Sequence, residues 1–102
     1  MNRADIDQSA AASAFWRLID HLGHRSDAQN VELMGLAGFC RNCLADWLRE
    51  ATEAGERPLS KDEAREAVYG MPYEAWKEHF QQPASPEQLT RMKESVARNP
   101  TG

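Results

Sequence analysis

The stretch LAGFCRNCLADW, residues 36–47, holds both cysteines of the chain and lies in the middle of its longest apolar pattern. Around it, apolar residues recur at helical spacing, and good helix formers fill the positions between them. The pattern predicts one helix that begins near Asp27 or Val31, ends at Ala54 and is stopped by Gly55. Because its apolar stripe covers about half of the helix surface, this helix is expected to lie at the centre of the fold.

Gly35 and Gly38 lie inside this predicted helix. Each glycine costs about 1 kcal/mol relative to alanine in a helix interior. Such a cost is typical of a place where a neighbouring backbone approaches closely, since glycine has no side chain. The alternative is that the helix kinks or breaks at one of the two glycines, and the sequence leaves both alternatives open.

An amphipathic pattern on the N-terminal side predicts one further helix. It begins near Ser9, ends at Leu22 and is closed by Gly23. The polar sequence HRSDAQN then separates it from the central helix. Within this polar sequence, Ser26 or Asn30 is expected to cap the start of the central helix.

Three short helices are expected in the C-terminal half. Ser60 and Glu63 match a capping box that opens a helix through Tyr69. Pro72 suits the first position of the next helix. After the linker QQPASP, Ser85 is expected to cap a last helix.

The fold class that follows is all-α, with four or five helices around the long central helix. No run of β-branched residues alternates with polar residues, so no strand is expected. At 102 residues the chain is expected to form one domain, with a helical core over residues 1–82. Residues 83–102 are expected to supply a linker, the last helix and a frayed tail. The side chains expected to be buried are Phe15, Leu18, Leu22, Leu33, Leu36, Cys40, Leu44, Trp47, Val68 and Trp76.

Composition restricts the kinds of partner. The net charge is −4 and the pI is about 5.3, so no general attraction to nucleic acid is expected. No apolar stretch has the length of a membrane span, and the N-terminus lacks the apolar segment of a secretory signal. We therefore expect a cytoplasmic protein with no nucleic-acid or membrane partner. In that compartment the two cysteines are expected to be reduced thiols unless they bind metal or act catalytically.

Cys40 and Cys43 form a Cys-x-x-Cys pair with three interpretations. One helical turn separates them, as it separates His21 from His24 on the first helix. If the two helices packed antiparallel, these four residues could bind zinc, which favours thiolate with imidazole. Structural zinc pairs normally lie on turns, however, and Cys40 lies near the centre of the apolar stripe. The favoured interpretation is therefore two packed core thiols and no cofactor.

The third interpretation is a redox dithiol. It requires an exposed thiol of low pKa at a helix N-terminus. About two turns of predicted helix precede Cys40, so this interpretation is disfavoured. Arg41 and Asn42 are expected on the polar side of the helix, in ordinary surface ion pairs. No phosphate-binding glycine loop, HExxH or G-x-S-x-G motif is present, so enzyme activity has no support and no catalytic residue is assigned.

A resemblance to a known family covers roughly residues 15–80. The segments DAQNVELMGLAGFCRNCLADWLREA and EAREAVYGMPYEAWKEHF resemble a small, uncharacterised bacterial family of about a hundred residues per chain. The block LAGFCRNCL is the specific part of this match. The resemblance implies an all-helical fold, an intertwined homodimer and no established activity. It implies no catalytic residues.

Length also favours a homodimer. A helix over residues 27–54 would be about 42 Å long, whereas a compact chain of this size is about 33 Å across. Its apolar stripe would extend beyond its own domain. The linker QQPASP is expected to let the last helix reach outward, where Leu89, Met92 and Val96 would need a surface to cover them. A second copy of the chain would cover both surfaces.

The function expected from the sequence is that of a homodimeric interaction or scaffold module with an unidentified protein partner. The alternative is a metal- or thiol-dependent protein that uses Cys40 and Cys43 with His21. The two alternatives differ in whether the cysteines are accessible and chemically reactive.

Overall fold

The computed structural model describes residues 1–100 and consists of helices and connecting loops within that range. A short 3-10 helix η1 (Arg3–Asp5) is followed by α1 (Gln8–Gly23), α2 (Asn30–Ala37), α3 (Arg41–Thr52), α4 (Lys61–Tyr69), α5 (Tyr73–Phe80) and α6 (Pro86–Val96). The predicted all-α class is confirmed. The described residues form six α-helices rather than four or five, because the expected central helix is divided into α2 and α3.

The break between α2 and α3 lies at Gly38, so the prediction of one long central helix is wrong. α2 ends at Ala37, and Gly38 follows it in the left-handed conformation with φ +75°. The amide of Gly38 donates to the carbonyl of Met34 (N···O 2.9 Å) and closes the last turn. Glycine adopts this conformation without a steric penalty, so the sequence permits a helix end at this position.

The far end of the chain holds this break in place. Asn99 Nδ2 donates to the carbonyl oxygen of Gly38 (2.9 Å), and Gly38 is buried. A Cβ added at Gly38 would collide with the Asn99 side chain. The expectation of a frayed tail from residue 99 onward is therefore wrong for Asn99, while Thr101 and Gly102 lie outside the described residues.

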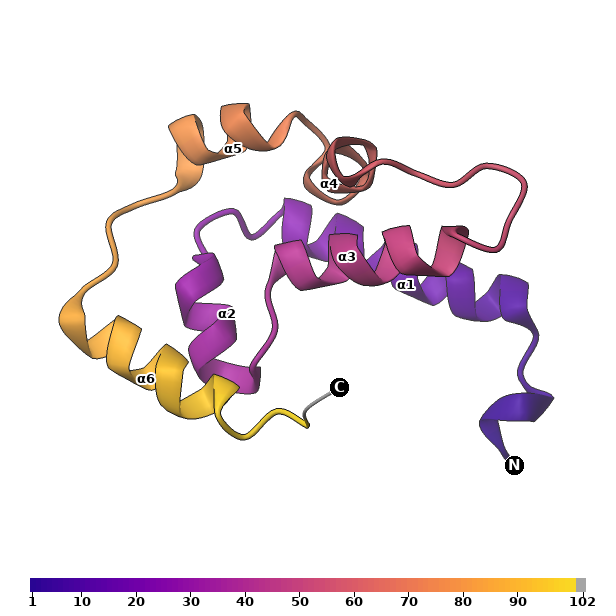
Figure 1. The fold of residues 1–102 in the computed structure, drawn as a ribbon, viewed down its shortest axis with the longest axis horizontal. Helices are drawn as coiled ribbons and strands as arrows, with labels where there is room; N and C mark the ends of the chain where they lie inside the picture. The colour runs from indigo at the N-terminus through magenta and orange to yellow at the C-terminus, as the bar shows by residue number, and fades with distance from the viewer. Residues whose placement is uncertain (101–102) are drawn as a thin grey trace.

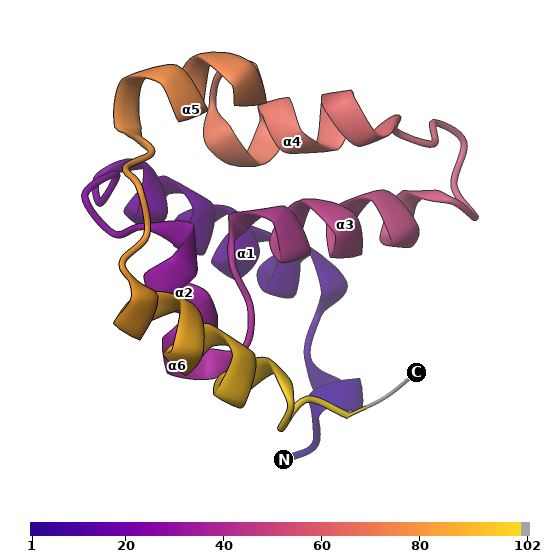
Figure 2. The ribbon, with the colours of Figure 1, turned by 60° about the vertical axis from the view of Figure 1, so that its left-hand side comes forward.

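The main hydrophobic core lies between α1, α3 and α4. Figure 2 shows α3 and α4 running side by side, with the loop between them at one end. α5 follows α4 after a short turn, and its buried Trp76 packs against Tyr69 of α4 (ring centroids 5.0 Å apart). The buried side chains of the core between α1, α3 and α4 are Ile19, Leu44, Ala45, Ala64 and Val68.

α2 and α6 pack together as a second, smaller unit. Figure 1 shows the two helices next to each other, with the linker after α5 crossing to the start of α6. The expectation that the last helix reaches away from its own chain is therefore wrong. Gly35 of α2 allows the close approach, because a Cβ there would lie 3.1 Å from the side chain of Arg91 on α6. The close neighbour of this glycine is a side chain rather than the expected backbone.

The break at Gly38 also changes which side chains are buried. Leu18, Leu36 and Trp47 were expected in the core but are exposed, with 39%, 83% and 53% of their surface accessible. For Leu36 and Trp47 the reason is that α2 and α3 have different axes, so the apolar stripe of one continuous helix does not exist. Of the other expected core residues, Cys40, Leu44, Val68 and Trp76 are buried, whereas Phe15, Leu22 and Leu33 are half-buried.

The capping box predicted at Ser60 is confirmed, and so is the cap predicted at Ser85, which also forms a capping box. Ser60 Oγ accepts a hydrogen bond from the amide of Glu63 (3.1 Å), and Ser85 Oγ accepts one from the amide of Gln88 (3.1 Å). In each box the side chain of the third helical residue, Glu63 or Gln88, accepts a hydrogen bond from the backbone amide of the serine. Among the helices of residues 1–100, none has the length and apolar character that a membrane span requires.

Candidate functional site

Cys40 is the N-cap of α3 and does not lie in a helix interior. Its backbone is extended (φ −144°, ψ −173°), and its carbonyl accepts the first hydrogen bond of the helix from the amide of Leu44 (3.2 Å). Cys43 is the third residue of the same helix, the N3 position. The expectation that two turns of helix precede Cys40 without interruption is wrong, because α2 ends before it. That expectation was the argument against a redox dithiol.

The two thiols differ in exposure. Cys40 is buried, with 7% of its surface accessible, and Cys43 is half-buried. Burial raises the pKa of the Cys40 thiol, the amides of Cys43 and Asn42 act in the opposite direction, and the nearby Cys43 thiol raises this pKa further. Cys40 therefore matches the expected core thiol and is protonated at neutral pH, whereas Cys43 is within reach of solvent.

Arg41, between the two cysteines, is buried to 2% exposure. Its Nη1 donates to the carbonyl of Ala28 (2.7 Å) and to Asn30 Oδ1 (3.0 Å), and its Nη2 donates to the carbonyl of Arg25 (2.8 Å). The guanidinium lies over the ring of Trp76, 4.9 Å from its centroid. Within residues 1–100 it forms no ion pair with a carboxylate, so the predicted surface ion pair of Arg41 is wrong. Burial lowers the pKa of this guanidinium.

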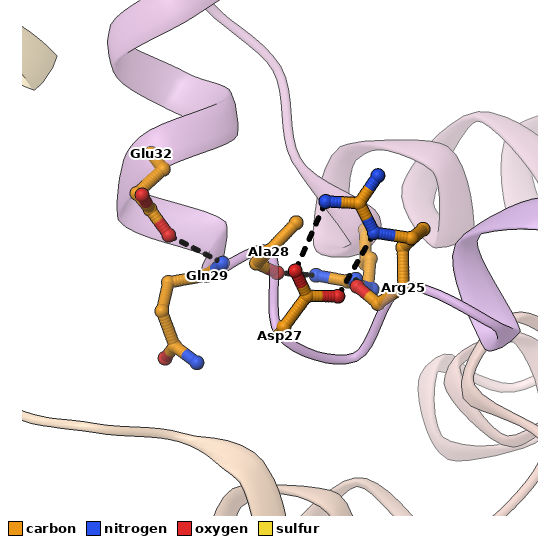
Figure 3. A network of polar contacts seen from close by, with 6 residues as sticks. Arg25, Asp27, Ala28, Gln29 and Glu32 are labelled. Carbon is orange, nitrogen blue, oxygen red and sulfur yellow. Dashed lines mark hydrogen bonds and ion pairs between the residues drawn. The ribbon is translucent and has the colours of Figure 1, made fainter.

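The loop between α1 and α2 supplies the carbonyl groups that bind Arg41. Figure 3 shows Arg25 paired with Asp27 on the surface of this loop, through two hydrogen bonds of 3.0 Å. The pairing raises the pKa of Arg25 and lowers that of Asp27. The same view shows Glu32 reaching back to the amide of Gln29 (2.9 Å). Gln29 is thus the N-cap of α2, and the predicted cap at Ser26 or Asn30 is wrong.

A polar network continues from Arg41 to the phenol of Tyr69. Tyr69 Oη donates to Asn42 Oδ1 (2.8 Å) and accepts from Asn30 Nδ2 (3.0 Å), while Asn42 Nδ2 donates to Tyr73 Oη (3.3 Å). Burial raises the pKa of Tyr69 above its ordinary value. The network joins α2, α3, α4 and α5, so Asn42 is an interior link rather than part of the expected surface ion pairs.

A pocket of about 410 Å³ lies beside Cys40, between α2, α6 and the linker over residues 81–84. Met34, Leu89 and Met92 contribute apolar surface to its wall. Gln29 also lines it, but its side chain already bonds the carbonyl of Phe80 (2.8 Å) and the amide of Gln82 (2.9 Å). The amide of Asn30 is likewise engaged by Arg41 and Tyr69. The side-chain amides of Gln29 and Asn30 therefore stabilise the fold and are not free to orient a ligand.

The four residues considered for zinc are not brought together. Cys40 and Cys43 lie at the start of α3, whereas His21 and His24 are exposed near the end of α1. Among residues 1–100, no group of three or more His, Cys, Asp or Glu side chains is arranged to hold a metal ion. The structure thus places the two cysteines together at the start of α3, as free thiols, and the two histidines at the end of α1.

Two large side chains of α1 and α3 form aromatic pairs while remaining exposed. Trp47 stacks on Phe39 with ring centroids 6.1 Å apart, and Trp16 meets the ring of Phe15 edge-on at 5.2 Å. Trp47 is 53% and Trp16 is 41% exposed. Leu36 at the end of α2 is the most exposed of the internal apolar residues, at 83%. These three side chains are among the most exposed large apolar residues of the described part of the chain.

Sequence reasoning missed the roles of Arg41 and Tyr69. Arginine is rarely buried, and the pattern of an uninterrupted helix placed Arg41 on the polar side. A signal was present in the combination of Gly38 with a cysteine two residues later, since a helix end at the glycine makes Arg41 the first residue of a new helix. The three oxygen atoms that accept hydrogen bonds from Arg41 belong to residues 11 to 16 positions earlier in the chain. No helical periodicity connects residues at such separations.

Residues 28–94 match the family described as "Protein of unknown function (DUF1244)", which covers more than half of the chain. No curated protein matches the chain. The matched residues include both cysteines, Arg41 and the Tyr69 network.

Proposed function

The chain belongs to the DUF1244 family of proteins of unknown function, and we propose that it acts as a homodimeric interaction module. The observation that carries this proposal is the large accessible surface of the single chain. It measures 7652 Å². A compact monomer of 11.5 kDa exposes about 5,800 Å², so this chain exposes about 1,850 Å² more than its mass requires.

The size of this excess fits a stable dimer. Permanent homodimers bury about 1,000–2,500 Å² on each partner. The radius of gyration supports the same proposal, since it is 15.0 Å where a compact chain of this length has about 12.8 Å. The chain is elongated, with principal-axis extents of 43 × 31 × 24 Å, and Figure 1 shows α2 and α6 lying to one side of α3; a second copy packed against it would give a more compact particle.

The chemistry of the exposed surface favours a protein partner. Trp47, Trp16 and Leu36 are large apolar side chains of three different helices, and tryptophan is enriched at the centres of protein interfaces. A two-fold axis would let each copy present the same surface to the other. The sequence resemblance described above implies a homodimer, and this expectation agrees with a second copy as the partner.

Light scattering at micromolar concentration tests the proposal. The expected mass is twice 11.5 kDa. Trp47→Ser is expected to shift the mass toward the monomer, because it removes an aromatic side chain from the proposed interface. Glu50→Ser is the matched control, since Glu50 is an exposed polar residue of the same helix. Circular dichroism checks that both variants remain helical, and a wild-type mass of 11.5 kDa at all concentrations would overturn the proposal.

A further inference from the structure

Cys40 and Cys43 occupy the two positions that form capping boxes elsewhere in this chain. At α4 these positions, N-cap and N3, are Ser60 and Glu63, whose side chains and amides bond reciprocally. The same arrangement recurs at α6. At α3 the two positions carry thiols instead, and Cys40 makes no side-chain capping bond. We propose that Cys40 and Cys43 form a reversible disulfide within the chain by exchange with a small-molecule disulfide.

The position at the helix start is what allows this bond. Inside a helix, residues three apart hold their Cβ atoms about 5–6 Å apart, whereas a disulfide needs about 3.5–4.5 Å. In the capping boxes of α4 and α6, the N-cap side chain reaches the N3 amide and the N3 side chain reaches back to the N-cap amide, because the N-cap backbone is extended rather than helical. The side chains at these two positions are thus turned toward each other's residue. Cys40 has such a backbone, with φ −144° and ψ −173°. Closing the disulfide breaks no capping hydrogen bond, since the Cys40 thiol makes none.

The exposures of the two thiols set the order of the exchange. Cys43 is half-buried, so its thiolate meets the oxidant first and attacks one sulfur of the small disulfide, releasing one small thiolate. The thiolate of Cys40 then attacks Sγ of Cys43 in this mixed disulfide. The second small thiolate leaves and each leaving group takes up one proton. In total, two protein thiols are oxidised to one disulfide, and one small disulfide is reduced to two thiols.

The surroundings of Cys40 determine how it enters the second step. Burial raises the pKa of its thiol, and the amides of Asn42 and Cys43 at the start of α3 offset only part of this rise, so the thiol keeps its proton until the mixed disulfide on Cys43 lies beside it. Burial of Cys40 protects it from direct attack by a bulky oxidant. One thiol is thus accessible and the other is shielded beside it, which is the arrangement of an attacking and a resolving cysteine.

Glutathione disulfide applied to the native protein tests the inference, followed by alkylation and intact-mass measurement. The wild type is expected to lose both alkylatable thiols, to gain no adduct and to become lighter by two hydrogen atoms. Dithiothreitol is expected to restore both thiols. Cys40→Ser keeps a favourable N-cap residue, so it is expected to fold and to accumulate one glutathione adduct on Cys43. Cys43→Ser is expected to react more slowly than Cys40→Ser, because only the buried thiol remains.

Three results would overturn the inference. They are a persistent glutathione adduct on the wild type, a disulfide between two chains on a non-reducing gel, and retention of both thiols by the wild type. Circular dichroism of the two variants ensures that an altered reaction is not caused by unfolding. Light scattering before and after oxidation reports the dimer separately, so the failure of either proposal can be distinguished from the failure of the other.

Discussion

At the scale of single residues, Gly38 determines where the central segment of the chain turns. It has φ +75°, and its carbonyl is bound by Asn99. Gly38→Ala is expected to destabilise the protein by about 2 kcal/mol, since the left-handed backbone costs about 1–2 kcal/mol for a residue with a Cβ and the methyl group would also collide with Asn99. Urea denaturation monitored by circular dichroism measures this change.

Gly70 is the matched control for Gly38. Its φ is +73°, and a Cβ added there would meet nothing within 4 Å. Gly70→Ala is therefore expected to carry the backbone cost alone and to destabilise the protein less than Gly38→Ala. Equal losses for the two variants would show that the contact with Asn99 contributes nothing to the break between α2 and α3.

Arg41 is the second residue whose substitution is informative. Arg41→Met keeps much of the side-chain volume but leaves the carbonyls of Arg25 and Ala28 and the amide of Asn30 without their donor. The expected loss is about 3 kcal/mol, because each unsatisfied buried acceptor costs about 1–3 kcal/mol and part of this is recovered by water. Urea denaturation is again the measurement. Arg25→Met, which removes only an exposed ion pair with Asp27, is expected to have little effect, and a similarly small effect for Arg41→Met would contradict the structural role.

At the scale of helices, local signals predicted some boundaries and failed at others. The starts of α4 and α6 could be predicted because Ser60 and Ser85 make their capping bonds to residues three positions away. The break at Gly38 could not, because the bond that holds it comes from Asn99, 61 residues later. Apolar spacing continued across the break, so the pattern alone indicated one helix. For the same reason, the sequence placed the cysteines correctly as neighbours but incorrectly in a helix interior.

The separate packing of α6 gives a prediction for its cap. Ser85→Ala is expected to cost about 1 kcal/mol and to increase amide hydrogen exchange in α6, because α6 packs mainly on α2 and can open without the core of α1, α3 and α4. Ser60→Ala is expected to affect the amides of α4 instead. Asp7→Ala is the control, since Asp7 caps α1 without a side-chain bond to the helix amides. Equal acceleration of exchange throughout the chain by Ser85→Ala would show that α6 does not open by itself.

At the scale of the whole molecule, the all-helical class followed from composition and periodicity, but the arrangement of two packed units did not. A local pattern shows which face of a helix is apolar and does not show which partner covers it. The Arg41 and Tyr69 network joins helices that are distant in the sequence. Several of its side chains are of types found mostly on protein surfaces, so their sequence pattern does not indicate a buried network. The candidate dithiol could be named from the sequence, whereas its place at a helix start required the structure.

The sparse core of the single chain makes its stability depend on the proposed partner. In residues 1–100 the buried apolar side chains are only Ile19, Cys40, Leu44, Ala45, Ala64, Val68, Tyr69 and Trp76. If a second copy covers the exposed apolar surface, unfolding is coupled to dissociation and the thermal midpoint rises with chain concentration. Each tenfold increase contributes about 1.4 kcal/mol per dimer, which corresponds to about 3 °C for two chains of this length. Differential scanning calorimetry at several concentrations measures this shift. Trp47→Ser is expected to lower the midpoint and to reduce its dependence on concentration, whereas Glu50→Ser is expected to retain both. A wild-type midpoint that stays constant over a roughly hundredfold range of concentration would show that the single chain is stable by itself.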